Sequence, residues 1–394
     1  MTDKSDTEVL QMKRLIALVL AVLLLALAGC TSREEPAETP DPAETAEATP
    51  NAAPPPTATP EPTPEPTPEP TPEPTPEPTP EPTPEPKFRN FFNGAPLTEP
   101  DYSRPFAVMI NNIKPAQPLC GIASADIVYE ALAEGGATRL MCIFSDISGA
   151  EHLGSIRSIR PYYIDISLGY GAISVHAGGS EEAYGRIRTE KFSDIDGVRG
   201  YYGSLEVFYR DQTRRYSGYA IEHTLFTEGK NLIAAAEHEG FPMTLPEDYQ
   251  NGLNFVKDAT PTDGERAESI KINFVYGKNT DFTYHADSGS YTAAQFGSDK
   301  ADAKTQETLK FSNVIVMEAA TRVLDNYGRL RIDLITEGEG YFACGGKYVP
   351  ITWKRESVQD CFHYYLADGS ELTVSPGKTF VAILAKGQST IEFE

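Results

Sequence analysis

Two arginines three positions apart are the side chains in this sequence best suited to bind an anion. Arg157 and Arg160 lie in the run Ser155-Ile-Arg-Ser-Ile-Arg160, with a hydroxyl group between them. A guanidinium donates two parallel hydrogen bonds to a carboxylate or a phosphate. On one helical turn the two arginines would share a face, whereas on a strand they would point to opposite sides. The spacing therefore predicts an anion ligand but leaves its geometry open.

A glycine-rich turn follows shortly afterwards. An apolar strand is expected over 172–175 and a helix over 181–187, joined by His176-Ala-Gly-Gly-Ser180. Glycine lets a ligand approach the backbone, and the start of a helix favours negative charge. The predicted anion-binding site consists of Arg157, Arg160, His176, Gly178, Gly179 and Ser180. In the alternative interpretation, the arginines pair with Glu130, Glu134 or Asp165 and the turn is purely structural.

The sequence indicates no established catalytic constellation. Under an enzymatic interpretation, His176 would act as acid or base and Glu130 or Asp165 would orient it. The chain contains neither HExxH nor GxSxG, and it has no P-loop. We predict no cofactor and no metal, because no CxxC or Cys/His ligand spacing occurs. The catalytic residues stay unknown at this level.

Four cysteines fall in the expected folded part. Two of them, Cys120 and Cys142, lie in its first half, and Cys344 and Cys361 lie in its second half. Outside the cell, each pair could form a disulfide. Buried free thiols are the equally weighted alternative.

The N-terminus has the pattern of a lipoprotein signal peptide. Lys13-Arg14 precedes an apolar run over 15–28, which is short for a transmembrane helix. The run ends in Leu27-Ala-Gly-Cys30, which predicts cleavage after residue 29 and lipidation of Cys30. The signal peptide is then 1–30, with Met12 as a second candidate start. Two acyl chains would anchor the protein in the cell membrane, facing the extracytoplasmic side.

Residues 31–87 are predicted to be a disordered stalk. Glu-Pro-Thr-Pro repeats from Glu61 onward, and the segment has almost no large apolar residue. Proline at every second position favours polyproline II, so the last 26 residues could span roughly 80 Å at about 3.1 Å per residue.

Residues 31–86 hold 13 acids and one base, and residues 87–394 carry −11 of the total charge of −23. This acidity argues against nucleic acid as a partner.

The remaining chain is long enough for two domains. Loop signals between 245 and 268 place a mixed α/β domain at 88–250 and a β-rich domain at 265–394. Alternating apolar residues in the second part predict a mainly antiparallel small barrel or sandwich. The expected fold class is therefore α+β.

Several stretches resemble the YerB-like lipoprotein family, which carries a two-part domain of unknown function. They include Arg104-Pro-Phe-Ala-Val-Met-Ile-Asn-Asn112, Ala125-Asp-Ile-Val-Tyr-Glu130, Glu134-Gly-Gly-Ala-Thr-Arg139, Gly154-Ser-Ile-Arg-Ser-Ile-Arg-Pro-Tyr162, Val175-His-Ala-Gly-Gly-Ser180, Thr352-Trp-Lys354 and Pro376-Gly-Lys-Thr379. The resemblance covers about 104–384. One departure is Glu222-His-Thr224, where the family usually has Pro-His-Asn. The resemblance implies a lipoprotein on the outer face of the cytoplasmic membrane and supplies no reaction.

Together these features predict a membrane-anchored extracellular lipoprotein. Its expected role is non-enzymatic binding of an anionic cell-envelope component or of a partner protein. The alternative is a hydrolase or transferase that acts on a cell-wall polymer.

Overall fold

The computed structural model describes residues 86–275 and 277–394. The predicted signal peptide, lipidated Cys30 and nearly all of the stalk lie outside these residues. Within the described part, no helix is long and apolar enough to cross a membrane.

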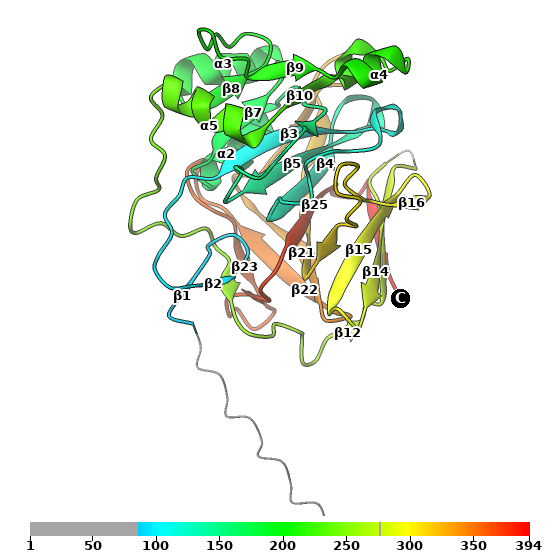
Figure 1. Ribbon diagram of the computed structural model, residues 1–394. Coiled ribbons are helices and arrows are strands. Elements are labelled where there is room, and N and C mark those ends of the chain that lie inside the picture. The colour runs from blue at the N-terminus through cyan, green and yellow to red at the C-terminus, as the bar shows by residue number, and fades with distance from the viewer. Residues whose placement is uncertain (1–85, 276) are drawn as a thin grey trace, which may run out of the picture. The chain divides into compact units, whose positions relative to one another are not determined.

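A sheet of eleven strands runs through the centre of the described part (Figure 1). In spatial order its strands are β12 (Glu265–Arg266), β22 (Lys347–Lys354), β21 (Glu337–Cys344), β18 (Asn313–Ala319), β25 (Thr379–Ala385), β4 (Ile127–Leu132), β5 (Thr138–Phe144), β3 (Phe106–Asn112), β7 (Ile173–His176) and β8 (Asp194–Asp196), with β23 (His363–Tyr365) beside β22. Both predicted domains contribute strands to it. The contact between them is the parallel pair β25 and β4.

A second sheet of six strands comes from the C-terminal half. It consists of β16 (Ser298–Asp299), β15 (Ser290–Gln295), β14 (Asn279–His285), β13 (Ser269–Asn273) and β26 (Thr390–Phe393), with β17 (Lys310–Phe311) beside β15. All its pairings are antiparallel. Ile270 and Phe282 share an apolar cluster with Val314 and Phe380 of the central sheet, so the two sheets pack face to face as a sandwich.

Shorter elements complete the described part. The small sheets are β6 (Leu153–Gly154) with β10 (Leu225–Thr227) and β9 (Phe208–Arg210), β1 (Phe88–Arg89) with β2 (Pro96–Leu97), β11 (Asn254–Phe255) with β24 (Thr373–Val374), and β19 (Thr321–Val323) with β20 (Leu330–Ile332). The helices are α2 (Pro161–Gly169), α3 (Glu181–Glu190), α4 (Gln212–Tyr216) and α5 (Gly229–His238), with 3₁₀ turns η1 (Lys114–Ala116), η2 (Glu134–Gly136) and η3 (Ile221–His223). The α+β class is thereby confirmed.

The central sheet is buried on both faces because its strands alternate two sets of apolar side chains. Along β3, Val108 and Ile110 contact the cluster that includes α5 and the second sheet. Ala107 and Met109 contact the opposite cluster, which includes α2. Pro161 occupies the first turn of α2, and Ser180 caps α3 by accepting from the amide of Ala183.

One buried carboxylate joins the two halves of the chain. Glu130 of β4 has no exposed surface. It accepts hydrogen bonds from Asn112 at 2.7 Å and Thr138 at 2.5 Å in the first half. It also accepts from Thr280 at 2.7 Å and Gln295 at 2.8 Å in the second half.

Two lysines complete this network. Nζ of Lys300 donates to Oδ1 of Asn112 at 3.0 Å, and Nζ of Lys278 donates to the carbonyl of Asn112 at 3.1 Å. Burial lowers the pKa of Lys278 to about 8, because the nearby Glu130 only partly offsets it and Lys300 adds to it. Each half therefore supplies groups that the other half needs.

Replacing Glu130 by alanine should strongly destabilise the fold. The change leaves Asn112, Thr280 and Gln295 without their buried acceptor and removes the carboxylate near Lys300, a class of loss that costs about 3–5 kcal/mol. The free energy of unfolding in urea measures it. The matched control is Glu268→Ala, which removes an exposed carboxylate paired with Arg266 and should change little. Equal effects of the two substitutions would contradict the role of the network.

The stability of the fold should rise with pH in the range where Lys278 titrates. The unfolded lysine has a pKa of about 10.4 and the folded one a lower pKa, so the unfolded chain binds more protons between these values. Against Lys278→Met, which lacks this titration, the wild type should gain free energy of unfolding as the pH rises from about 8 to about 10. Urea unfolding at several pH values measures the difference between the two proteins. A constant difference would contradict the expectation.

Candidate functional site

The two segments of the predicted anion site lie side by side. Residues 155–157 run along β3, where the amide of Arg157 donates to the carbonyl of Met109 at 2.9 Å. On the other side, the carbonyl of Arg157 accepts from the amide of Ala177 at 3.0 Å, and Ile159 pairs with Gly179. The structure thus brings the arginine run and the glycine turn together.

A third arginine, which sequence reasoning did not single out, joins the first two. Arg139 of β5 lies directly opposite Asn111 of β3, one strand away from the arginine run. Its Nη1 donates to the carbonyl of Ser158 at 2.8 Å. Burial lowers the pKa of Arg139 to about 10, and the charge of Arg160 acts in the same direction. We call Arg139, Arg157, Arg160 and Glu134 the arginine cluster.

Glu134 is the acid of this cluster. Arg160 binds both of its carboxylate oxygens, with Nη2 at 2.9 Å from Oε2 and Nε against Oε1. Arg139 reaches Oε2 at 3.3 Å. Burial alone would raise the pKa of Glu134, but the hydrogen bond from Arg160 and the two guanidinium charges bring it below its ordinary value. Arg160 therefore has the structural partner that the alternative interpretation expected.

Arg157 differs from its neighbours. Its Nη1 donates to the backbone carbonyl of Glu222 at 3.3 Å, and no carboxylate oxygen of the described residues forms an ion pair with it. Burial and the charge of Arg160 lower its pKa, while the carboxylate of Glu222 opposes them. Arg157 is a half-buried guanidinium that the described part of the protein leaves without an ion pair.

The glycine turn holds an anion that belongs to the protein itself. Oδ1 of Asp196 accepts from the amide of Gly178 at 2.8 Å and from that of Val198 at 2.9 Å. Its Oδ2 accepts from the hydroxyl of Tyr184 at 2.8 Å. Gly178 has a φ of +78°, which a side chain would strain. The amide of Gly178, part of the predicted anion site, is therefore bonded to Asp196 of the protein itself.

His176 is fully buried beneath this turn. Nδ1 lies 2.9 Å from the carbonyl of Gly178, and Nε2 lies 3.2 Å from Oδ2 of Asp194. Both ring nitrogens are therefore engaged inside the protein. Ser180 likewise uses its hydroxyl as the cap of α3.

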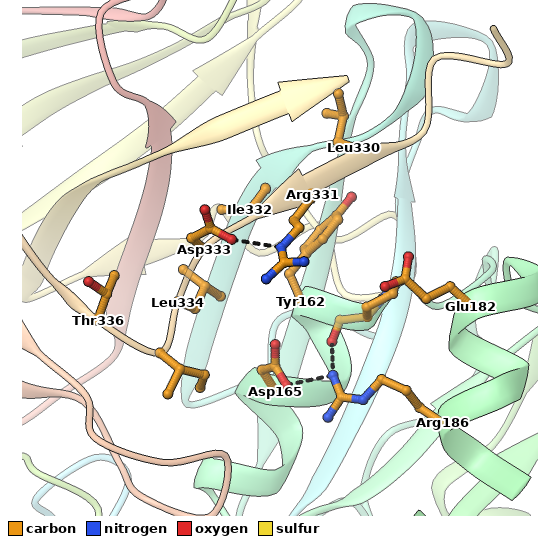
Figure 2. Close-up of a pocket in the computed structure, with 12 residues that line it drawn as sticks. Tyr162, Asp165, Glu182, Arg186, Leu330, Arg331, Ile332, Asp333, Leu334 and Thr336 are labelled. Carbon is orange, nitrogen blue, oxygen red and sulfur yellow. Dashed lines mark hydrogen bonds and ion pairs between the residues drawn. The ribbon is translucent and has the colours of Figure 1, made fainter. Parts of the chain in front are cut away.

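Asp165 and Glu130 lie in different surroundings. Glu130 belongs to the buried network described above. Asp165 of α2 pairs with Arg186 at 2.6 Å and lines a cavity of about 450 Å³ between α2 and the β20 segment, shown in Figure 2. Burial raises the pKa of Asp165, although Arg186 opposes the shift. Arg186 is itself bonded to Glu190, and Arg331 across the cavity is bonded to Asp333.

A buried histidine faces the arginine cluster from another loop. Nδ1 of His223 lies 3.0 Å from Nδ2 of Asn111, and burial lowers the pKa of the imidazole. The hydroxyl of Thr224, the next residue, donates to the carbonyl of Ile221 at 2.8 Å. Sequence reasoning also offers His223 as a histidine to test after His176, within Glu222-His-Thr224.

All four cysteines of the described part are free thiols. Cys142 lies within β5 opposite Val108, whereas Cys120 pairs through its backbone with Gly154. In the second half, Sγ of Cys344 contacts Ser375 and Sγ of Cys361 contacts His363. The two candidate disulfides are therefore not formed.

Comparison with known proteins places the chain in a family. Residues 92–242 match the family described as protein of unknown function (DUF3048) N-terminal domain, and residues 270–381 match its C-terminal domain. The candidate lipoprotein YerB of Bacillus subtilis (strain 168) is 31% identical over 71% of this chain and 81% of its own length. The chain belongs to the YerB-like family. The resemblance drawn from the sequence motifs is thereby confirmed.

The crystal structure of the Bacillus subtilis YerB protein also matches the fold. The TM-score is 0.67 at 26% sequence identity, over 78% of this chain and all of that one. The boundary between the two family matches, at residues 243–269, falls in the loop region between the predicted parts. No reaction is assigned to the family, so the function has to be inferred from the site.

Glu134 should be a stability residue of the YerB-like fold. Glu134→Gln leaves Arg139 and Arg160 close together without a shared negative charge, which should cost about 2 kcal/mol of unfolding free energy after discounting for partial exposure. Chemical denaturation measures the loss. Glu206→Gln, at an exposed position, is the matched control. A Glu134→Gln variant as stable as this control would show that the ion pairs are dispensable.

Proposed function

We propose that this YerB-like protein is a lipoprotein that is anchored outside the cell and binds an anionic component of the envelope through Arg157. The observation that carries the proposal is the half-buried guanidinium of Arg157, which has no ion pair among the described residues. An arginine held partly away from water is usually paired, because desolvating an unpaired charge is costly. An external phosphate or carboxylate would supply the missing partner.

The surroundings of Arg157 add to this proposal. Arg139 and Arg160 share the single carboxylate of Glu134 and Arg157 adds a third positive charge, so the arginine cluster is positive within a domain that is acidic overall. Such a local field attracts anions and gives specificity for charged groups. The fixed pairing of Arg160 with Glu134 leaves Arg157 as the arginine available to a ligand.

The anchor and stalk support the location. The lipoprotein name of the Bacillus subtilis relative agrees with the Leu-Ala-Gly-Cys30 pattern at the N-terminus. A stalk that spans tens of ångströms would carry the folded part away from the membrane surface. Reach of this kind suits a tethered binder, because the length of a tether sets the effective concentration of its target.

The enzymatic alternative has less support. A general acid or base needs a ring nitrogen or carboxylate within reach of the substrate. Both nitrogens of His176 bind groups of the protein, and Glu130 has no exposed surface. Asp165 does line a cavity, but its carboxylate pairs with Arg186. We therefore favour binding without turnover.

Arg157→Ala should weaken anion binding without unfolding the protein. Loss of a charge-assisted hydrogen bond of about 1.5 kcal/mol corresponds to roughly a tenfold rise in Kd. Titration calorimetry with inorganic polyphosphate and with polygalacturonate distinguishes phosphate from carboxylate ligands. Arg331→Ala is the matched control, because it removes an exposed arginine that pairs with Asp333.

Three results bear on this proposal. Binding that falls in Arg157→Ala and persists in Arg331→Ala supports it. Equal losses in both variants would indicate nonspecific attraction of polyanions and overturn it. No binding of either polymer by the wild type would also overturn it.

A further inference from the structure

The end of the loop between β22 and β23 and the first residue of β23 carry three side chains of the kinds that bind transition metals. Asp360, Cys361 and His363 each offer one ligand atom, and the three atoms lie within 4.8 Å of one another. Nε2 of His363 is 3.1 Å from Oδ1 of Asp360 and 3.6 Å from Sγ of Cys361. We propose that Asp360, Cys361 and His363 bind a zinc ion.

The spacing of the three atoms suits a common tetrahedral centre. Zinc binds thiolate sulfur at about 2.3 Å and imidazole nitrogen or carboxylate oxygen at about 2.0–2.2 Å. At tetrahedral angles these bond lengths place sulfur about 3.6 Å from nitrogen and nitrogen about 3.4 Å from oxygen. The observed separations are 3.6 Å and 3.1 Å. Two of the three separations are therefore close to those of a tetrahedral site, and the third, between sulfur and oxygen, is within 4.8 Å.

The local fold explains why the thiol and the imidazole face the same way. Phe362, between them, is buried and packs edge-on against Trp353 at a centroid distance of 5.8 Å. Alternate residues of an extended segment point to opposite sides, so burial of Phe362 turns Cys361 and His363 together to the other side. The sequence signal is therefore a Cys-x-His run across one buried aromatic residue, and not the paired cysteines sought above.

The third ligand is held in place by its own neighbours. Oδ2 of Asp360 accepts from the amide of Glu356 at 3.1 Å, which leaves Oδ1 directed at His363. The carbonyl of Asp360 accepts from Nε of the buried Arg355 at 2.8 Å. Outer hydrogen bonds of this kind orient metal ligands and raise affinity.

The donor set indicates both the metal and an open position. One sulfur, one nitrogen and one oxygen form a mixed set that suits zinc better than the hard ions calcium and magnesium. Binding forms a zinc–sulfur bond as the thiol of Cys361 loses its proton to solvent. The side chain of His363 is 37% exposed, so a fourth position is accessible to water. The trio shares no residue with the arginine cluster.

Cobalt titration of the full chain after chelator treatment tests the site. Cobalt(II) substitutes for zinc in protein sites, and a thiolate bound to it gives a sulfur-to-cobalt charge-transfer band in the near ultraviolet. The wild type should show this band, and excess zinc should remove it. Cys361→Ser should abolish the band, and His363→Ala should weaken zinc binding by at least about tenfold.

Two variants serve as matched controls. Cys344→Ser removes another thiol of the same half of the chain, and His285→Ala removes a half-buried histidine bonded to Thr292. Both should keep the band. Without metal, Cys361→Ser should melt at the wild-type temperature, and added zinc should raise the melting temperature of the wild type but not of this variant.

Two outcomes overturn the proposal. One is absence of the thiolate band in the wild type at saturating cobalt. The other is a band that survives in Cys361→Ser, because the ion would then bind another thiol of the chain.

Discussion

The parallel pairing of β25 with β4 is the interaction on which the described fold depends. The two strands are separated by about 250 residues of sequence, and they pair over the register from Thr379 with Ile127 to Ile383 with Ala131. On its other edge β25 pairs with β18. The centre of the sheet therefore forms only when the C-terminal strand β25 pairs with β4 and β18. The arginine cluster lies on β5 and the neighbouring loops, and its position depends on this strand order.

The Glu130 network fixes the register of the pairing between β25 and β4. A shift of one residue would move Glu130 to the opposite face of the sheet, away from Lys300 and Gln295. The carboxylate would then lie buried against apolar side chains without donors. A buried ionic group contributes little to net stability when it is well paired, but its misplacement is costly. The network therefore determines how the two halves pair more than it adds to the stability of the fold.

Local chemistry in the sequence predicted local structure well. The strand expected over 172–175 and the helix expected over 181–187 depend on signals within a few residues, and the structure has β7 and α3 there. The order of the strands could not be predicted in the same way, because β25 meets β4 and β18 through contacts between distant segments. The same limit hid Arg139, whose role depends on which strand lies beside it.

The glycine turn shows why an anion-binding motif does not by itself identify a ligand site. Converging amides and a helix start require a negative charge, and Asp196, eighteen residues beyond Gly178, satisfies that requirement from within the chain. Sequence alone cannot distinguish an internal carboxylate from an external one. The two cases are distinguished by whether each positively charged or hydrogen-bond-donating group already has an acidic partner within the protein. Gly178, His176 and Arg160 each have an acidic partner in the structure, whereas the guanidinium of Arg157 has a single backbone carbonyl. Within this site, Arg157 is therefore the residue that we propose for binding an outside anion.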